Sequence, residues 1–139
     1  MKNVLVIDAQ GGGIGKQIVT LLRKEIDNIH ILAVGSNSVA TNAMLKAGAD
    51  EAATGENSVI VTAGMADIIV GPIGIAIADS MLGEITPAMA VAIGRSRAKK
   101  VFIPFYTCDN YVVGLEKTGT SALIRMAVER ISQILEEIR

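Results

Sequence analysis

Short runs of apolar, β-branched residues alternate along the chain with segments whose apolar positions recur every three or four residues. The runs have the length of buried strands, and the segments between them have the period of amphipathic helices. Continuously apolar strands are typical of a parallel sheet whose two faces are both covered. We therefore predict a three-layer, Rossmann-like α/β fold with a doubly wound, mostly parallel sheet of five or six strands.

The predicted parallel strands occupy residues 3–7, 29–34, 51–53, 67–70 and 100–104. We expect them in the spatial order 3-2-1-4-5. One more apolar run, residues 111–115, follows the fifth strand too closely for a helical crossover. An antiparallel edge strand is therefore expected there.

Helices are predicted between these strands. The first begins near Ile14, the second spans residues from the Ser36 or Asn37 cap to about 47, and the others cover 56–64, 75–82, 87 to about 95–97 and 120 onward. Thr86 and Pro87 mark one start clearly, because a threonine cap precedes proline at the first helical position. The last helix places Ile124, Ala127, Ile131, Ile134 and Ile138 on one face.

The most informative segment is the glycine-rich loop DAQGGGIGK, residues 8–16, between the first strand and the first helix. Glycine lets the backbone turn tightly and approach a ligand closely. The following helix start offers free N–H groups and a partial positive charge, which suit phosphate. We predict that this loop binds the phosphate of a nucleotide, through Asp8, Gln10, Gly11, Gly12, Gly13, Ile14, Gly15 and Lys16. The alternative is that the glycines serve only a tight turn and close packing.

Known fingerprints match this loop only in part. The dinucleotide pattern G-x-G-x-x-G has Gln10 in place of its first glycine, and the short-chain dehydrogenase turn has Ala9 there. The residues from Gly12 to Lys16 also resemble a deviant Walker A core, but Gln17 follows where a metal-binding hydroxyl is needed. ATP hydrolysis is therefore the least favoured interpretation. Binding of NAD(P) or of another nucleotide is preferred to it.

Dinucleotide-binding proteins usually carry an acidic residue at the end of the second strand for the ribose. This chain has Ser36 and Asn37 there, with no acid and no arginine. Both remain candidates for a ribose or phosphate contact, and helix capping is the alternative. Asp8 either serves a ribose, a metal or a proton, or accepts hydrogen bonds from the loop's own N–H groups.

A second glycine loop follows the strand at residues 67–70. Gly71 and Gly74 are expected to close over the first loop, because ligands of such sheets lie at the carboxyl ends of strands. Asp79 and Glu84 flank the next predicted helix, and either they project into the same cleft or they lie at the surface, which is the preferred interpretation.

Composition narrows the class of protein. The 139 residues are 50% hydrophobic and 19% charged, which fits a single domain over residues 1–139 and excludes disorder. Cys108 is the single cysteine and His30 the single histidine, so an internal disulfide is excluded and no metal site is predicted. A net charge of −1 argues against nucleic acid as a partner. Asp67 interrupts the apolar stretch 58–78, so we expect a cytoplasmic rather than a membrane protein.

The sequence says less about function and assembly than about the fold. Tyr106 and Tyr111 both lack a lysine four residues on, so binding or sensing is favoured over catalysis, and whether the protein is an enzyme stays open. A Rossmann-shaped scaffold without ligand is the alternative. The apolar content is high for a small chain, so a homodimer is expected, with the segment 73–90 in its interface.

The chain also resembles a family of short bacterial proteins described as a domain of unknown function. The resemblance spans nearly the whole length and rests on residues 7–15, 44–49, 53–57, 71–74 and 82–87. The family tends to have glycine where this chain has Ala9. The resemblance implies a Rossmann-like α/β protein and brings no activity, substrate or catalytic residue.

Overall fold

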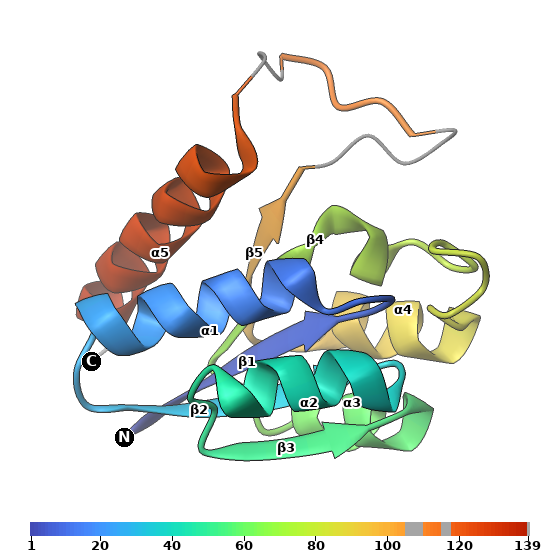
Figure 1. Cartoon of the computed structure of the whole chain (residues 1–139), viewed down its shortest axis with the longest axis horizontal. Helices are drawn as coiled ribbons and strands as arrows, with labels where there is room; N and C mark the ends of the chain where they lie inside the picture. The colour runs from blue at the N-terminus through green and yellow to red at the C-terminus, as the bar shows by residue number, and fades with distance from the viewer. Residues whose placement is uncertain (105–109, 115–117, 139) are drawn as a thin grey trace.

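One parallel sheet organises the chain in the computed structural model, which describes residues 1–104, 110–114 and 118–138. Its strands, in spatial order, are β3 (Glu51–Thr54), β2 (Ile29–Gly35), β1 (Lys2–Asp8), β4 (Ile68–Pro72) and β5 (Lys99–Ile103) (Figure 1). All neighbouring strands pair in parallel. The predicted class and strand order are confirmed.

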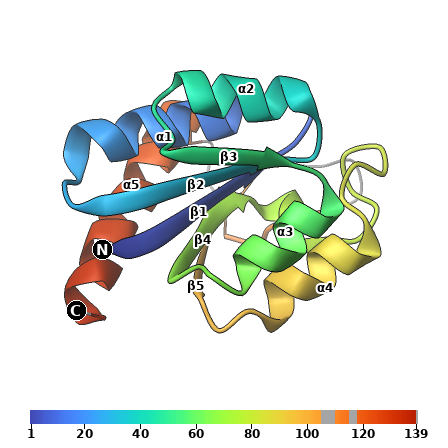
Figure 2. The ribbon, with the colours of Figure 1, turned by 90° about the horizontal axis from the view of Figure 1, so that it is seen from below.

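Helices cover both faces of the sheet and make the three layers (Figure 2). One face carries α1 (Gly13–Glu25), α2 (Ser38–Lys46) and α5 (Thr120–Glu137). The other carries α3 (Glu56–Ala63) and α4 (Pro87–Arg95). The chain changes face after β3, which makes the sheet doubly wound.

The central strand explains why two separate cores form. Successive side chains of a strand point to opposite faces. Val4 and Val6 of β1 therefore pack beneath α1, while Leu5 and Ile7 pack beneath α3, and all four are fully buried. Each such burial contributes roughly 1.5–3 kcal/mol relative to an exposed side chain.

The last helix follows its predicted pattern. Ile124, Ala127, Ile131 and Ile134 are buried against the sheet, and Ile138 packs at the edge of the same core. Thr86 caps α4 as expected, because its Oγ1 accepts a hydrogen bond from the Met89 N–H at 3.2 Å.

Two predicted elements are wrong in the described residues. Instead of a helix over 75–82, the chain makes one 3₁₀ turn, η1 (Ile73–Ala76), and then a series of turns. The Asp79 N–H donates to the Ile85 carbonyl at 2.7 Å, so the segment folds back and buries both Ile75 and Ile85 in the same core. Residues 111–114 form no strand of the sheet, and Leu115 lies outside the described residues.

The apolar residues of the segment 73–90 are mostly covered within the chain. Ile75, Ile85 and Met89 are buried, and Leu82 is the large apolar side chain left exposed. The reason for placing a dimer interface on this segment is therefore weaker than the sequence indicated. Among the described residues, no helix is both long and apolar enough to cross a membrane.

Close packing makes Gly35, at the end of β2, intolerant of a side chain. A Cβ there would lie 2.5 Å from the Thr41 nitrogen and 2.7 Å from the Asn37 carbonyl oxygen. Both are backbone atoms, so we expect Gly35→Ala to lower the free energy of unfolding by about 1–3 kcal/mol.

Gly94→Ala in α4 is the matched control, because nothing lies within 4 Å of its added Cβ. Alanine is the better helix former, so this variant should gain about 0.5–1 kcal/mol. Urea denaturation measures the free energy of unfolding of both variants. Equal values for Gly35→Ala and Gly94→Ala would contradict the packing argument.

Candidate functional site

A cavity of about 500 Å³ lies at the carboxyl ends of β1 and β4. The chain runs outward from β1 through β2 to β3, and then continues with β4 on the other side of β1. This change of direction is where open α/β sheets bind their ligands. The cavity is lined by the glycine-rich loop, by Pro72 and Gly74 after β4, and by Thr120 at the start of α5.

Two glycines of the loop are required by packing. Gly12, the residue that precedes α1, has φ of 74°, and a Cβ there would lie 2.7 Å from the Ala40 Cα. A Cβ on Gly15 would lie 2.6 Å from the Met44 sulfur and 2.9 Å from the Asp8 Cβ. These two positions therefore fit the expectation of a tight turn that packs a helix closely.

Gly11 and Gly13 are different. An added Cβ meets nothing within 4 Å at either position, and neither residue has a positive φ. Backbone conformation and packing would thus accept a side chain at both. What the two glycines do provide is an uncovered backbone on the wall of the cavity.

The loop also leaves backbone donors unused. Among the described residues, no acceptor takes the N–H groups of Gly11, Gly13 and Ile14, whereas Gly12 donates to the Ala9 carbonyl at 3.1 Å. Gly13 and Ile14 begin α1, so their N–H groups carry part of the positive end of the helix dipole. The cavity wall therefore offers three donors suited to an anion.

Asp8 braces this loop from within. It is 3% exposed, its Oδ1 accepts from the Ala9 N–H at 2.8 Å, and its Oδ2 accepts from the Gly15 N–H at 2.6 Å. Burial raises the pKa of the carboxyl above its ordinary value, although the two backbone N–H groups act in the opposite direction. Of the roles considered for Asp8, the geometry favours bonding to the loop's own N–H groups.

Glu84, for which the surface role was preferred over projection toward the loops, reaches the glycine-rich loop. Its Oε1 accepts from the Gln10 N–H at 2.9 Å, the Ser36 hydroxyl at 2.6 Å and the Asn37 side-chain amide at 2.7 Å. The Ser36 hydrogen bond is the main reason that the pKa of Glu84 lies below its ordinary value. In Figure 1 the yellow-green turn segment that carries Glu84 lies beside the dark-blue tip of the glycine loop.

Of the other predicted site residues, Asn37 contacts the glycine loop, whereas Gly71 and Lys16 do not line the cavity. Asn37 caps α2, because its Oδ1 accepts from the Ala40 N–H at 3.0 Å, while its amide group also donates to the Gln10 carbonyl at 2.9 Å. Gly71 does not line the cavity, and its Cβ would overlap the Ile7 carbonyl oxygen. Lys16 is exposed on α1 and does not line the cavity either, whereas Gln17 does.

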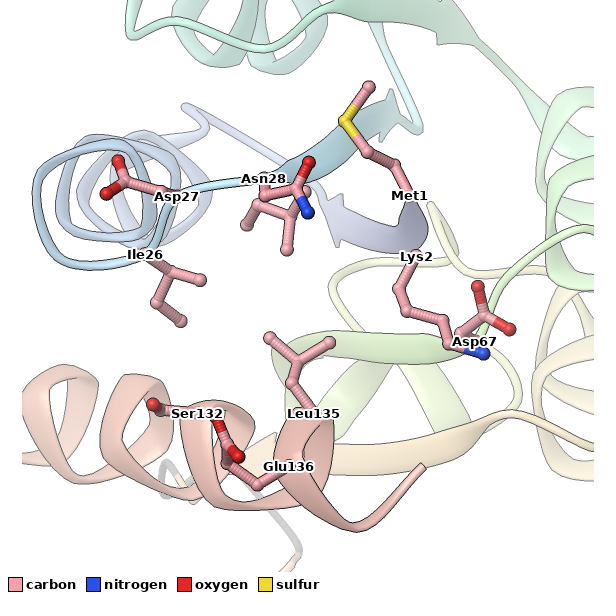
Figure 3. Close-up of a pocket in the computed structure, with 10 residues that line it drawn as sticks. Met1, Lys2, Ile26, Asp27, Asn28, Asp67, Ser132, Leu135 and Glu136 are labelled. Carbon is pink, nitrogen blue, oxygen red and sulfur yellow. The ribbon is translucent and has the colours of Figure 1, made fainter. Parts of the chain in front are cut away.

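A second cavity, of about 460 Å³, lies at the opposite ends of the strands (Figure 3). It opens between the start of β1, the turn after α1 and the end of α5, and Ile26 and Leu135 point into it from opposite sides. Asp67 at its rim accepts from the Asn3 N–H at 2.8 Å and so joins β1 to β4. This cavity lies at the amino ends of the strands, away from the carboxyl edge where open α/β sheets bind their ligands.

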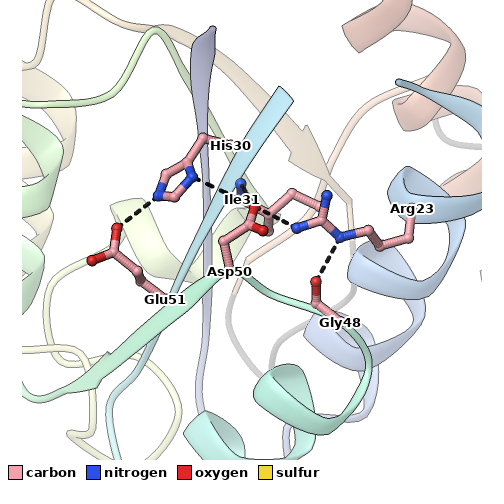
Figure 4. A network of polar contacts seen from close by, with 6 residues as sticks. All are labelled: Arg23, His30, Ile31, Gly48, Asp50 and Glu51. Carbon is pink, nitrogen blue, oxygen red and sulfur yellow. Dashed lines mark hydrogen bonds and ion pairs between the residues drawn. The ribbon is translucent and has the colours of Figure 1, made fainter. Parts of the chain in front are cut away.

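His30 also lies at that far end, in β2. Its Nε2 lies 2.6 Å from Glu51, and its Nδ1 lies 3.6 Å from Asp50, which Arg23 also contacts (Figure 4). The Ile31 N–H, with Arg23 second, lowers the pKa of Asp50. The network fastens β2, β3 and α1 together.

Across the described ranges, no cluster of His, Cys, Asp and Glu side chains could hold a metal ion.

Sequence similarity assigns the family. Residues 3–136 match the model of the domain of unknown function DUF3842, and the chain belongs to that family. No curated protein matches the chain.

Among the solved structures that are similar to this chain, two illustrate the low identity. One is a dodecameric FMN-dependent UbiX-like decarboxylase from Escherichia coli O157:H7, 17% identical over 95% of this chain and 76% of that one, with a TM-score of 0.48. The other is AibC, 22% identical over 95% of this chain and 42% of that one, also with a TM-score of 0.48. Similarity at this level says nothing about what this chain binds.

The burial of Asp8 predicts a specific pH dependence. A carboxyl whose pKa is raised on folding keeps its proton in the native state at pH values where the unfolded chain has lost it. Its contribution to the free energy of unfolding therefore falls as pH rises from about 4 upward. We expect the stability difference between the wild type and Asp8→Asn to shift against the wild type between pH 4 and 7, measured by urea denaturation.

Asp50→Asn is the control of opposite sign. The pKa of Asp50 is lowered on folding, so the stability that it contributes is present above its ordinary pKa and is lost as pH falls through the folded value. The stability difference between wild type and Asp8→Asn and that between wild type and Asp50→Asn should therefore change in opposite directions with pH. If both differences change in the same direction, the conclusion that burial raises the pKa of Asp8 is wrong.

Proposed function

We propose that the protein binds the phosphate of a nucleotide or dinucleotide at the glycine-rich loop, and that it binds or senses this ligand rather than converting it. The observation that carries the proposal is the set of three unused N–H groups, on Gly11, Gly13 and Ile14, along the wall of the cavity. Backbone N–H groups at a helix start are a general solution for binding phosphate.

The surroundings of these donors fit such a ligand. The start of α5 also lines the cavity through Thr120, so two helix N-termini contribute to its wall. Its volume of about 500 Å³ lies within the range usual for small-molecule sites. NAD(P) belongs to the ligand class that the donors favour, as do smaller nucleotides.

The titratable groups support binding over catalysis. Among the described residues that line the cavity, Asp8 is the one with an ionisable side chain. Both of its oxygens already accept hydrogen bonds from the loop. A general base needs a free oxygen within reach of the substrate's proton, and Asp8 in this arrangement serves the loop instead.

The clearest test compares two glycines. Gly13→Ala places a methyl group in the open space beside the donors, so we expect the affinity for nucleotides and for pyrophosphate to fall at least about tenfold, which is 1.4 kcal/mol. The same variant should keep or gain stability, by about 0.4–1 kcal/mol, since its backbone conformation suits alanine. Calorimetric titration with AMP, ADP, NAD and pyrophosphate measures the first effect, and urea denaturation the second.

Gly94→Ala, which is far from the cavity, should bind all four ligands like the wild type. If none of them binds the wild type, the ligand-free scaffold becomes the better explanation. If Gly13→Ala binds as tightly as the wild type, the phosphate lies elsewhere.

The oligomeric state and the cellular location of the protein stay predictions from the sequence. We propose a homodimer on the grounds of composition, and the described surface adds Ile60, Val61 and Met65 of the α3 region and Val91 of α4, all of them more than 40% exposed. Light scattering at micromolar concentration should give twice the chain mass of 14.5 kDa, and the monomer mass would contradict the proposal. A cytoplasmic location is proposed from composition alone.

A further inference from the structure

We propose that Glu84 reads the ribose of the bound nucleotide, so that the site accepts an unmodified 2′,3′-diol and rejects a 2′-phosphate. This inference rests on the proposed function, because it requires the phosphate to lie at the glycine loop. It goes beyond that function by naming the ligand class and the residue that selects it.

The position of Glu84 carries the first step. Ser36 and Asn37 directly follow β2, at the place where dinucleotide-binding folds hold an acidic residue for the ribose. This chain has no acid in that stretch, but the turn segment after η1 delivers the Glu84 carboxylate to it. The missing group is thus supplied from a part of the chain 48 residues away.

The hydrogen bonds of Glu84 carry the second step. All three donors, from Gln10, Ser36 and Asn37, converge on Oε1 and fix the orientation of the carboxylate. No described residue donates a hydrogen bond to Oε2. A fixed carboxylate with one unengaged oxygen is a strong acceptor for hydroxyl groups, and a ribose diol offers two hydroxyl donors.

The spacing allows a single nucleotide to reach both groups. Glu84 is not part of the cavity lining but binds the N–H of Gln10, which is, while the unused donors begin at the next residue, Gly11, and extend to Ile14. Consecutive Cα atoms are 3.8 Å apart, so Gln10 and Gly13 are separated by at most about 11 Å. A 5′-phosphate at the loop and a ribose at Glu84 are therefore compatible with one nucleotide.

Charge decides against a 2′-phosphate. Such a group carries about −1.5 to −2 charges at neutral pH and would lie against an ionised carboxylate. No lysine or arginine occurs in residues 35–38, and no salt bridge to Glu84 is found in the described part of the chain. Among the described residues, therefore, no side-chain cation compensates the repulsion at Glu84.

The competing explanation is that Glu84 only anchors its own turn segment. Anchoring uses Oε1 alone, and glutamine retains a side-chain oxygen that can accept the same three hydrogen bonds. Glu84→Gln therefore separates the two roles, because it keeps the anchor and removes the negative charge and the second acceptor.

Calorimetric titration of the full chain tests the inference with AMP, 2′-deoxy-AMP, adenosine 2′,5′-bisphosphate and pyrophosphate. For the wild type we expect AMP to bind at least tenfold more tightly than either the 2′-deoxy or the 2′-phosphorylated nucleotide. In Glu84→Gln the affinity for AMP should fall several-fold, and the gap to the bisphosphate should close or invert. Pyrophosphate, which has no ribose, should bind Glu84→Gln at least as tightly as the wild type.

The outcomes are separable. If AMP and pyrophosphate bind, but the wild type treats all three nucleotides alike, the role of Glu84 is overturned and the phosphate site stands. If pyrophosphate does not bind and no nucleotide does, both proposals fall. The wild-type comparison needs no variant, so the inference remains testable even if Glu84→Gln fails to fold.

Discussion

The structure depends on how β1, a strand buried on both faces, passes into α1 within four residues. A turn this tight exposes backbone N–H groups that cannot be paired within the helix. Asp8 takes two of them from within the loop, and Glu84 takes a third from the turn segment that follows η1. The residues whose N–H groups are left over line the cavity, so the way the turn is satisfied also determines where we propose that an anion binds.

The glycines of the loop perform two separate tasks in this arrangement. Gly12 and Gly15 let α1 approach α2 and Asp8 more closely than any side chain would allow. Gly11 and Gly13 have no such neighbours, so packing gives no reason for their lack of a side chain. Of the two explanations considered from the sequence, packing accounts for Gly12 and Gly15, and ligand approach stays the proposed explanation for Gly11 and Gly13.

Much of the fold could be predicted because its signals are local. The parallel, doubly wound class followed from apolar runs alternating with helical periods, and helix starts followed from residues such as Thr86 with Pro87. The order 3-2-1-4-5 was expected because it is usual for such folds, since the local runs do not specify it. The segment 75–82 failed because its apolar composition suits a helix, while tertiary contacts fold it back to bury Ile75 and Ile85 together. For Glu84 the surface role was preferred over projection into the cleft for the same reason, since no local pattern reports that a turn segment reaches Ser36.

These observations place two carboxylates beside a site proposed for an anion, and their surroundings explain how that is possible. The Asp8 carboxylate is enclosed by the loop and bonded to N–H groups on both of its oxygens, so it faces the protein. Glu84 is held by three neutral donors beside Gln10, at one end of the run of residues that offers unused N–H groups. A ligand that carries its negative charge at one end and hydroxyl groups at the other matches this division, since the N–H groups take the charge and the carboxylate takes the hydroxyls. A ligand charged at both ends does not match it.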